Sequence, residues 1–116
     1  MDYLILHQAN KQIVQSIGQI AGFTPEQVPW ESLSKYGNQS SASIPVAICC
    51  RLQDAGRDLR LMLCGYGIGL SWASCLGSFP ELRIFAVHDF VPPGPPVGRA
   101  EHIARWRRKF KGEDNG

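Results

Sequence analysis

The chain has 116 residues, of which 44% are hydrophobic and 19% charged, and it carries a formal net charge of +2 at pH 7. These values are ordinary for a globular protein and exclude a collagen-like or strongly charged disordered chain, so we expect one domain with a modest core. No window holds the roughly 18 consecutive apolar residues of a membrane-spanning helix, and the N-terminus lacks the pattern of a secretory signal. The sequence therefore predicts a cytoplasmic protein without a membrane span.

Charge is distributed unevenly along the chain. Residues 1–98 carry six Lys and Arg against seven Asp and Glu, a net charge of −1, whereas residues 99–116 carry six against three, a net charge of +3. A near-neutral body with a basic tail is typical of a protein whose tail meets an acidic partner.

The four cysteines lie inside apolar runs. Cys49, Cys50, Cys64 and Cys75 lack the C-x-x-C spacing of a zinc or redox site, and none stands at a sharp turn beside a basic group. We therefore expect reduced, buried thiols, with neither a disulfide framework nor a metal site.

The first third of the chain predicts alternating strands and helices. Tyr3–Leu6 is a short, continuously apolar run, typical of a strand buried on both faces. From Lys11 the apolar residues recur at helical spacing until Gly22, which is placed as a helix stop. Thr24–Gln27 has the pattern of a single capped turn, and a short strand is expected at Pro29–Leu33.

A polar turn at Tyr36–Asn38 leads into an apolar helix. The serines at 40, 41 and 43 are expected to cap the first amides of that helix. The run Ile44–Cys50 has no polar face, so we expect a buried central helix from about Ser43 to Ala55. An ordinary turn followed by a capped helix explains the same stretch without any functional site.

The second half of the chain predicts a hairpin. Strands are expected at Leu59–Cys64 and Leu70–Leu76, joined by the glycine-rich stretch Gly65–Gly69, with one more strand candidate at Leu82–Val87. The order of elements implies an α/β fold with a mixed sheet and helices packed against it.

Four segments follow from these patterns. Residues 1–77 form the domain, 78–91 an extra strand or loop, 92–98 a Pro-rich linker and 99–116 a basic tail. Within the tail, Arg99–Lys111 predicts a helix with Ile103, Trp106 and Phe110 on one side. An alternative is a tail that stays disordered until it meets a partner.

Two polar side chains follow predicted strands. His7 comes directly after the first strand, and Asn38 follows the second strand candidate, so adjacent parallel strands would bring the two together. A neutral His and an Asn amide can both donate hydrogen bonds to one developing oxyanion. A lone His at this place is more often structural, so both interpretations stay open.

Three motifs follow one another in the chain: His7-Gln8-Ala9-Asn10, Tyr36-Gly37-Asn38 with Ala42-Ser43-Ile44-Pro45, and Gly65-Tyr66-Gly67-Ile68-Gly69-Leu70-Ser71-Trp72. Together they resemble the C-terminal half of a 3-oxoacyl-acyl-carrier-protein synthase III, in the thiolase-like superfamily. The similarity covers about Asp2 to Gly77. It implies a thiolase-like half-domain with a mixed five-stranded-type sheet, a buried central helix and a second helix layer.

The resemblance implies a decarboxylative Claisen condensation of an acyl-coenzyme A with malonyl-acyl-carrier protein, with the coenzyme A thioester as substrate and no further cofactor. It implies catalytic roles for His7 and Asn38, an oxyanion loop at Gly67, Ile68 and Gly69, and a coenzyme A contact at Asn10. A dinucleotide site at the glycine-rich loop is disfavoured, because a strand pattern rather than a helix follows it.

The half that carries the nucleophilic cysteine in this family has no counterpart among these residues. One hypothesis is therefore a catalytic half that needs a complementary N-terminal half, or a homodimer, and that is inactive alone. The other hypothesis is a non-catalytic interaction module whose tail docks acyl carrier protein, a membrane surface, nucleic acid or another acidic partner. We favour acyl carrier protein and acyl-coenzyme A as partners, with no nucleic acid.

Overall fold

The computed structural model of the chain describes residues 1–55, 58–91, 94 and 98–111. In chain order the elements are β1 Tyr3–Leu6, α1 Lys11–Ile20, a 3₁₀ turn Pro25–Gln27, α2 Glu31–Tyr36, a second 3₁₀ turn Ser40–Ala42, α3 Ser43–Arg51, β2 Leu59–Gly67, β3 Ser71–Phe79 and α4 Arg99–Lys111.

The strands form one mixed sheet in the order β1-β2-β3. β1 runs parallel to β2, with Leu4 opposite Met62, and β2 runs antiparallel to β3, with Leu63 opposite Cys75. The α/β class, the mixed sheet and the glycine-rich hairpin are thereby confirmed. The described residues form three strands rather than the five that the resemblance implies.

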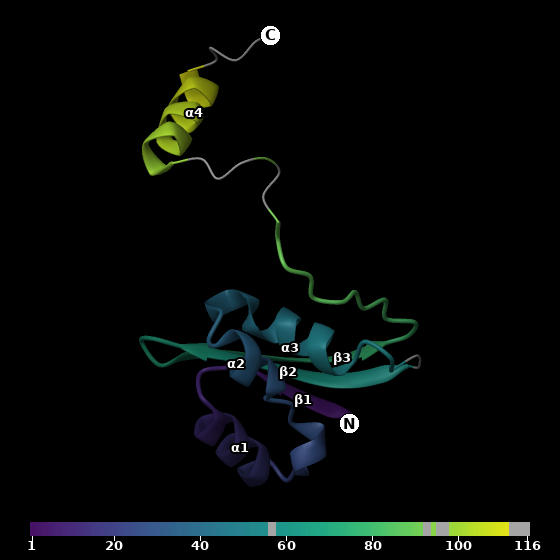
Figure 1. The fold of residues 1–116 in the computed structure, drawn as a ribbon. Coiled ribbons are helices and arrows are strands. Elements are labelled where there is room, and N and C mark those ends of the chain that lie inside the picture. Colours follow the sequence, from purple (N-terminus) through teal and green to yellow (C-terminus); the bar gives the residue numbers. More distant parts are fainter. Residues whose placement is uncertain (56–57, 92–93, 95–97, 112–116) are drawn as a thin grey trace.

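The sheet has a hydrophobic cluster on each face, and Figure 1 shows α1 on one side of it and α3 on the other. The first cluster is built on Leu4, Leu6, Val14 and Val28. The second is built on Leu52, Leu59 and Leu61. Burying each such side chain is worth about 1.5–3 kcal/mol, so these two clusters hold the layers together.

The helix α1 packs closely because of one glycine. A Cβ added to Gly18 would lie 2.7 Å from Cγ2 of Val28, closer than side chains approach in real structures. Asn10 precedes the helix, and its Oδ1 accepts a hydrogen bond from the Ile13 N–H at 2.9 Å. The cap fixes the start of α1, and the small residue lets the helix approach Val28 in the first cluster.

The predicted strand at Pro29–Leu33 is wrong, because α2 begins at Glu31. The Glu31 carboxylate accepts a hydrogen bond from the Trp30 N–H at 3.0 Å, and Ser34 Oγ donates to the Glu31 carbonyl at 2.8 Å. These contacts satisfy backbone groups at the start of a helix, whereas a strand would need a neighbouring strand edge.

The predicted strand at Leu82–Val87 is also wrong. We call residues 80–91, which follow β3, the extension; in Figure 1 it runs from the end of β3 over the outer side of α3. Leu82 and Ile84 pack against the second hydrophobic cluster, while Phe85 is 76% exposed. The alternation that suggested a strand is therefore satisfied by packing of Leu82 and Ile84 against the second cluster, without strand pairing.

The central helix is shorter and less enclosed than predicted. α3 ends at Arg51 rather than Ala55. Ala47 is buried, but Pro45 and Cys50 are exposed. The serines also do not cap this helix by side-chain hydrogen bonds.

The apolar residues of β1 and of the start of β2 are covered within the chain. Leu4, Ile5 and Leu6 are at most 1% exposed, as are Leu59 and Leu61. They are buried because α1 and α3 cover one face of the sheet each and the extension adds to the second cluster.

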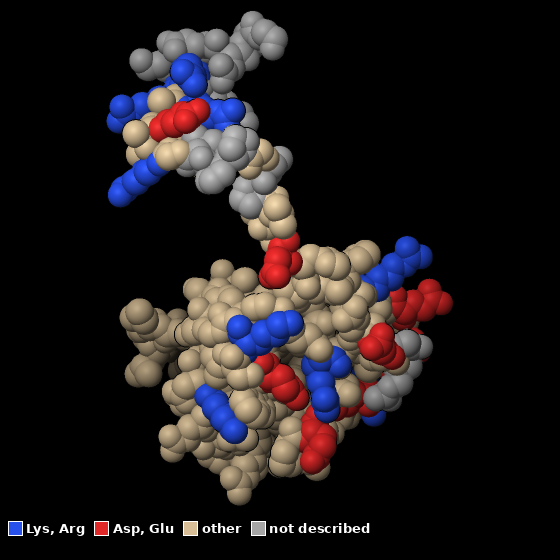
Figure 2. Space-filling view, in the orientation of Figure 1, with Lys and Arg blue, Asp and Glu red and all other residues tan. Residues whose placement is uncertain are grey.

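The helix α4 lies apart from the layers in Figure 1, and its predicted formation at Arg99–Lys111 is confirmed. Figure 2 shows Lys and Arg gathered on α4, whereas both signs of charge are interspersed on the visible face of the body. The expected Pro-rich linker at 92–98 lies mostly outside the described residues. No helix in the described ranges is long and apolar enough to cross a membrane.

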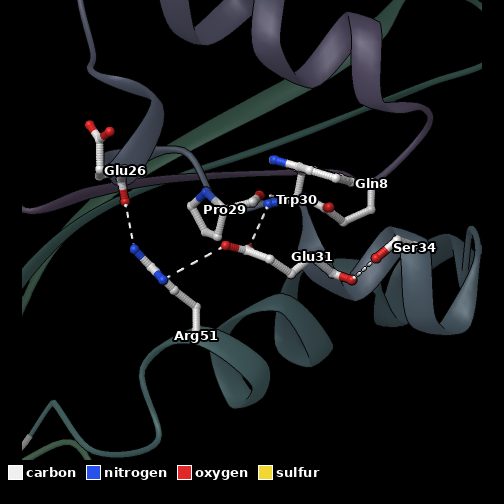
Figure 3. A network of polar contacts seen from close by, with 7 residues as sticks. All are labelled: Gln8, Glu26, Pro29, Trp30, Glu31, Ser34 and Arg51. Carbon is white, nitrogen blue, oxygen red and sulfur yellow. Dashed lines mark hydrogen bonds and ion pairs between the residues drawn. The ribbon is translucent and has the colours of Figure 1, made fainter.

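A polar network joins β1, α2 and α3 (Figure 3). Gln8 is fully buried, and its Nε2 donates hydrogen bonds to the carbonyl oxygens of Leu6 at 2.8 Å and Pro29 at 3.2 Å. At the end of α3, Arg51 lies 3.7 Å from the Glu31 carboxylate and donates to the Glu26 carbonyl at 3.3 Å. The ion pair between Arg51 and Glu31 is half exposed and adds little stability. The hydrogen bonds of the buried Gln8 amide therefore contribute more to the stability of this network.

We predict that Gln8→Ala lowers the free energy of unfolding by about 1–3 kcal/mol, because it leaves two buried carbonyl groups without their donor. Chemical denaturation followed by circular dichroism measures the change. Gln15→Ala is the matched control, since Gln15 is exposed on α1. Equal stability of the two variants would contradict the assigned role of Gln8.

Deleting residues 99–116 is expected to leave the melting temperature almost unchanged, because α4 lies apart from the body in Figure 1. Differential scanning calorimetry checks this. The contrasting variant is Ile84→Asp, which puts a charge against the second cluster and should lower the melting temperature by several degrees. Loss of cooperative melting in the deletion variant would show that the tail belongs to the core.

Candidate active site

An open cavity of about 970 Å³ lies where the end of β1, the start of α3 and the β2–β3 hairpin meet. Its lining residues are His7, Asn38, Ser40, Ser41, Ser43, Ile44, Gly65, Tyr66, Gly67, Ile68, Ser71, Trp72 and Ala73. All three motifs singled out in the sequence contribute to this lining.

His7 stands directly after β1 and is held from three sides. Its backbone N–H donates to the Cys64 carbonyl at 2.9 Å, which extends the pairing of β1 with β2 by one residue. Its ring packs edge-on against the Tyr66 ring, with centroids 5.3 Å apart and planes at 80°. The Tyr66 hydroxyl donates to the His7 carbonyl oxygen at 3.0 Å. The imidazole therefore has a defined position at the cavity wall.

Ser43 determines which ring nitrogen of His7 can meet a ligand. Ser43 is buried at the start of α3, and its Oγ lies 2.6 Å from Nδ1 of His7. The same Oγ accepts a hydrogen bond from the Gln8 N–H at 3.3 Å. A Ser43 hydroxyl that donates to Nδ1 leaves the proton of the neutral imidazole on Nε2. In that tautomer Nε2 is a hydrogen-bond donor.

Asn38 reaches the cavity from the turn after α2. Gly37 has φ 71° and ψ −159°, a conformation that is essentially restricted to glycine. Asn38 Oδ1 accepts a hydrogen bond from the Ser40 N–H at 2.9 Å, and Ser40 itself has φ 55°. Because the carbonyl end of the side chain is engaged, its amide group is the end that can donate to a ligand.

Asn38 was predicted to follow a strand parallel to β1, but it follows the helix α2. Asn38 and His7 nevertheless line the same cavity, because the connection from α2 to α3 passes the end of β1. The hydrogen bond between Ser43 and His7 marks the place where that connection meets the end of the strand.

The hairpin contributes two of its three predicted residues to the cavity. Gly67 and Ile68 line it, whereas Gly69 is not among the lining residues. Tyr66 and Trp72, which the sequence argument did not assign to the site, also line it and lie opposite each other in the β2–β3 pairing. Aromatic residues on both sides of a glycine-rich hairpin were the signal available in the sequence.

Tyr66 remains a hydrogen-bond donor at neutral pH. Burial raises the pKa of its phenol above the usual value, with a further contribution from Cys64. The protonated hydroxyl can therefore keep its hydrogen bond to the His7 carbonyl.

Asn10 does not line the cavity. Its side-chain oxygen caps α1 through the Ile13 N–H, and the residue is exposed at the start of that helix. The coenzyme A contact implied for Asn10 stays a prediction.

The cysteines lie away from the cavity lining. Cys49 and Cys64 are half-buried, as expected for core residues, but Cys50 and Cys75 are exposed, so the prediction of buried thiols is wrong for these two. Partial burial still raises the pKa of the Cys50 thiol, which disfavours the thiolate. Among the described residues, no group of three or more His, Cys, Asp and Glu could hold a metal ion.

Sequence comparison relates the chain to one enzyme family. Residues 1–79 match the family described as 3-oxoacyl-[acyl-carrier-protein] synthase III C terminal. The β-ketoacyl-[acyl-carrier-protein] synthase III of Rhodopirellula baltica is 42% identical over 82 residues, which are 66% of this chain and 22% of that protein. The chloroplastic synthase III of Arabidopsis thaliana is 38% identical over 78 residues, 66% of this chain and 19% of that protein.

Structure comparison gives the same result. A crystal structure of a 3-oxoacyl-(acyl-carrier protein) synthase from Burkholderia xenovorans is similar with a TM-score of 0.68 and 37% sequence identity, over 73% of this chain and 25% of that one. The chain thus spans about a fifth to a quarter of the length of these relatives. The match, the mixed sheet and the cavity motifs agree: the chain belongs to the family of 3-oxoacyl-[acyl-carrier-protein] synthase III C-terminal domains.

Proposed function

We propose that this chain is the C-terminal catalytic half of a β-ketoacyl-acyl-carrier-protein synthase III-like acyltransferase. Its reaction is the decarboxylative Claisen condensation of an acyl-coenzyme A with malonyl-acyl-carrier protein, in fatty acid or related biosynthesis in the cytoplasm. The observation that supports this most directly is the presence of His7 and Asn38 in one cavity, each with one end of its side chain already engaged.

The proposed chemistry needs hydrogen-bond donors where negative charge develops. A cysteine of the complementary half first accepts the acyl group from coenzyme A. When the malonyl thioester loses carbon dioxide, the electron pair of the broken C–C bond forms an enolate, with its charge on the thioester oxygen. Nε2–H of His7 and the Asn38 amide would donate to that oxygen. The enolate carbon then attacks the acyl carbonyl and releases the cysteine thiolate.

The surrounding residues would act on the geometry of these donors. Ser43 would hold His7 in the tautomer that places the proton on Nε2, and Tyr66 would hold its backbone. The hairpin backbone from Gly67 to Gly69 would complete the oxyanion hole at the acyl-cysteine. Asn10 would contact the pantetheine arm of coenzyme A.

The chain alone lacks the nucleophile that this mechanism requires. None of its four cysteines lines the cavity, and the residues that match its relatives cover only 22% and 19% of those proteins. We therefore propose that activity needs a complementary N-terminal half that supplies the reactive cysteine.

We predict that His7→Ala and Asn38→Ala each lower condensation by about a hundredfold or more, because each removes one oxyanion donor. The assay uses a chimera in which residues 1–79 replace the matching C-terminal segment of the Rhodopirellula baltica relative. Release of carbon dioxide from malonyl-acyl-carrier protein is measured as a second readout.

The matched control is His88→Ala, since His88 is exposed and outside the cavity lining. It should leave both rates unchanged. Effects of less than about tenfold for both His7→Ala and Asn38→Ala would reduce these residues to a structural role.

The isolated chain is expected to be inactive and to associate, either with itself or with the complementary half. Large apolar side chains are exposed on the hairpin, with Ile68 at 103%, Leu70 at 88% and Trp72 at 74%. Exposed apolar groups in one place favour association. Size-exclusion chromatography with light scattering at micromolar concentration measures the mass. A stable monomer that binds no hydrophobic dye, or turnover by the chain alone, would refute the half-enzyme proposal.

The second candidate is a non-catalytic interaction module that docks acyl carrier protein or another acidic partner. The basic helix α4 favours it, because α4 lies outside the residues that match the family. Detection of a partner chain carrying the cysteine half would favour the catalytic proposal over this one.

A further inference from the structure

The helix α4 combines strong positive charge with exposed apolar side chains. Its sequence carries Arg99, Arg105, Arg107, Arg108, Lys109 and Lys111 against one acidic residue, Glu101. Ile103 is 41% exposed and Trp106 is 49% exposed. A helix that faces only solvent gains nothing from exposing a large apolar side chain such as Trp106. The positive charge and the exposed apolar side chains together therefore indicate a binding surface.

The apolar side chains lie on one strip of the helix. Ile103 and Trp106 are three residues apart, so their directions differ by about 60° at roughly 3.6 residues per turn. By the same geometry, Arg107 lies about 40° beyond Ile103, and Arg105 lies about 100° beyond Trp106 on the other side of the strip. The Trp106 Nε1–H donates to Nε2 of His102 at 3.0 Å, which orients the indole along the helix surface. The strip thus has one cationic side chain at its border and a second farther round the helix.

We propose that α4 is a docking helix for an anionic phospholipid surface, on which it lies in the plane of the interface. Ile103 and Trp106 would enter the boundary between headgroups and acyl chains, and Arg105 and Arg107 would meet lipid phosphates. The 13 residues of α4 extend over about 20 Å, less than the roughly 30 Å of hydrocarbon that a spanning helix must cross. The helix therefore lies on the membrane.

The geometry favours lipid over other acidic partners. Nucleic acid would use the arginines through its phosphates but would leave Ile103 in water. Tryptophan beside cationic side chains is the combination that membrane interfaces favour.

Co-sedimentation of the full chain with lipid vesicles tests the proposal. The probes are vesicles of phosphatidylcholine alone and vesicles of equal parts phosphatidylcholine and phosphatidylglycerol. We expect at least about tenfold tighter binding to the anionic vesicles, weakened by salt, because each basic side chain near the surface contributes to affinity.

Two variants separate charge from insertion, and circular dichroism confirms that each keeps its fold. Arg105→Glu/Arg107→Glu should abolish binding to anionic vesicles, whereas Arg60→Glu/Arg83→Glu, the same charge change on exposed residues of the body, should retain most of it. Trp106→Ala should weaken binding several-fold at constant charge.

Three outcomes would overturn the proposal: no preference for anionic vesicles, full binding by Arg105→Glu/Arg107→Glu, or no effect of Trp106→Ala. Holo-acyl-carrier protein and a double-stranded oligonucleotide are measured in parallel, and binding of either that is tighter than binding of the vesicles and is lost in Arg105→Glu/Arg107→Glu would also overturn it. None of these results depends on condensing activity.

Discussion

The hydrogen bond between Ser43 Oγ and His7 Nδ1, 2.6 Å long, is the contact on which the candidate site depends. It joins the end of β1 to the start of α3, two elements that lie 36 positions apart in the chain. Gln8, the residue after His7, is anchored by its buried side chain to Pro29 just before α2. The catalytic candidates therefore keep their geometry only while the sheet and the two helices keep their packing.

The extension changes what a complementary half would encounter. Leu82 and Ile84 pack against the second hydrophobic cluster, and Ala86 and Val87 line a small cavity of about 280 Å³ together with side chains of α2 and α3. The extension also runs over the outer side of α3 in Figure 1. A partner that packs on this side of α3 would have to displace the extension, whose contacts through half-buried Leu82 and Ile84 are worth less than those of a core. A partner that binds α3 more tightly than the extension does could therefore displace it.

The proposed division of labour follows from the same geometry. Two side-chain donors on one rigid wall can stabilise an oxyanion without the nucleophile being part of the same chain, because their positions are set by contacts within this chain. Basic charge is placed elsewhere, on α4, beyond the residues that match the family. Catalysis would then use the cavity, and membrane binding would use α4. A substitution in one of these surfaces could leave the function of the other unchanged.

The sequence by itself determined the features that depend on neighbouring residues: the buried strand at Tyr3–Leu6, the glycine-rich hairpin, and the helical pattern of the tail. Predictions from the sequence were wrong where an apolar run could pack against either of two elements of the fold. The alternation at Leu82–Val87 is the same for a strand on a sheet edge and for a segment lying on α3, and only tertiary packing decided between them. The role of Ser43 was equally hidden, because a serine at the start of a helix looks like a cap until His7, 36 positions away, is brought within 2.6 Å of it. Local spacing encodes backbone conformation, whereas side-chain partners across the fold are set by packing that no local pattern contains.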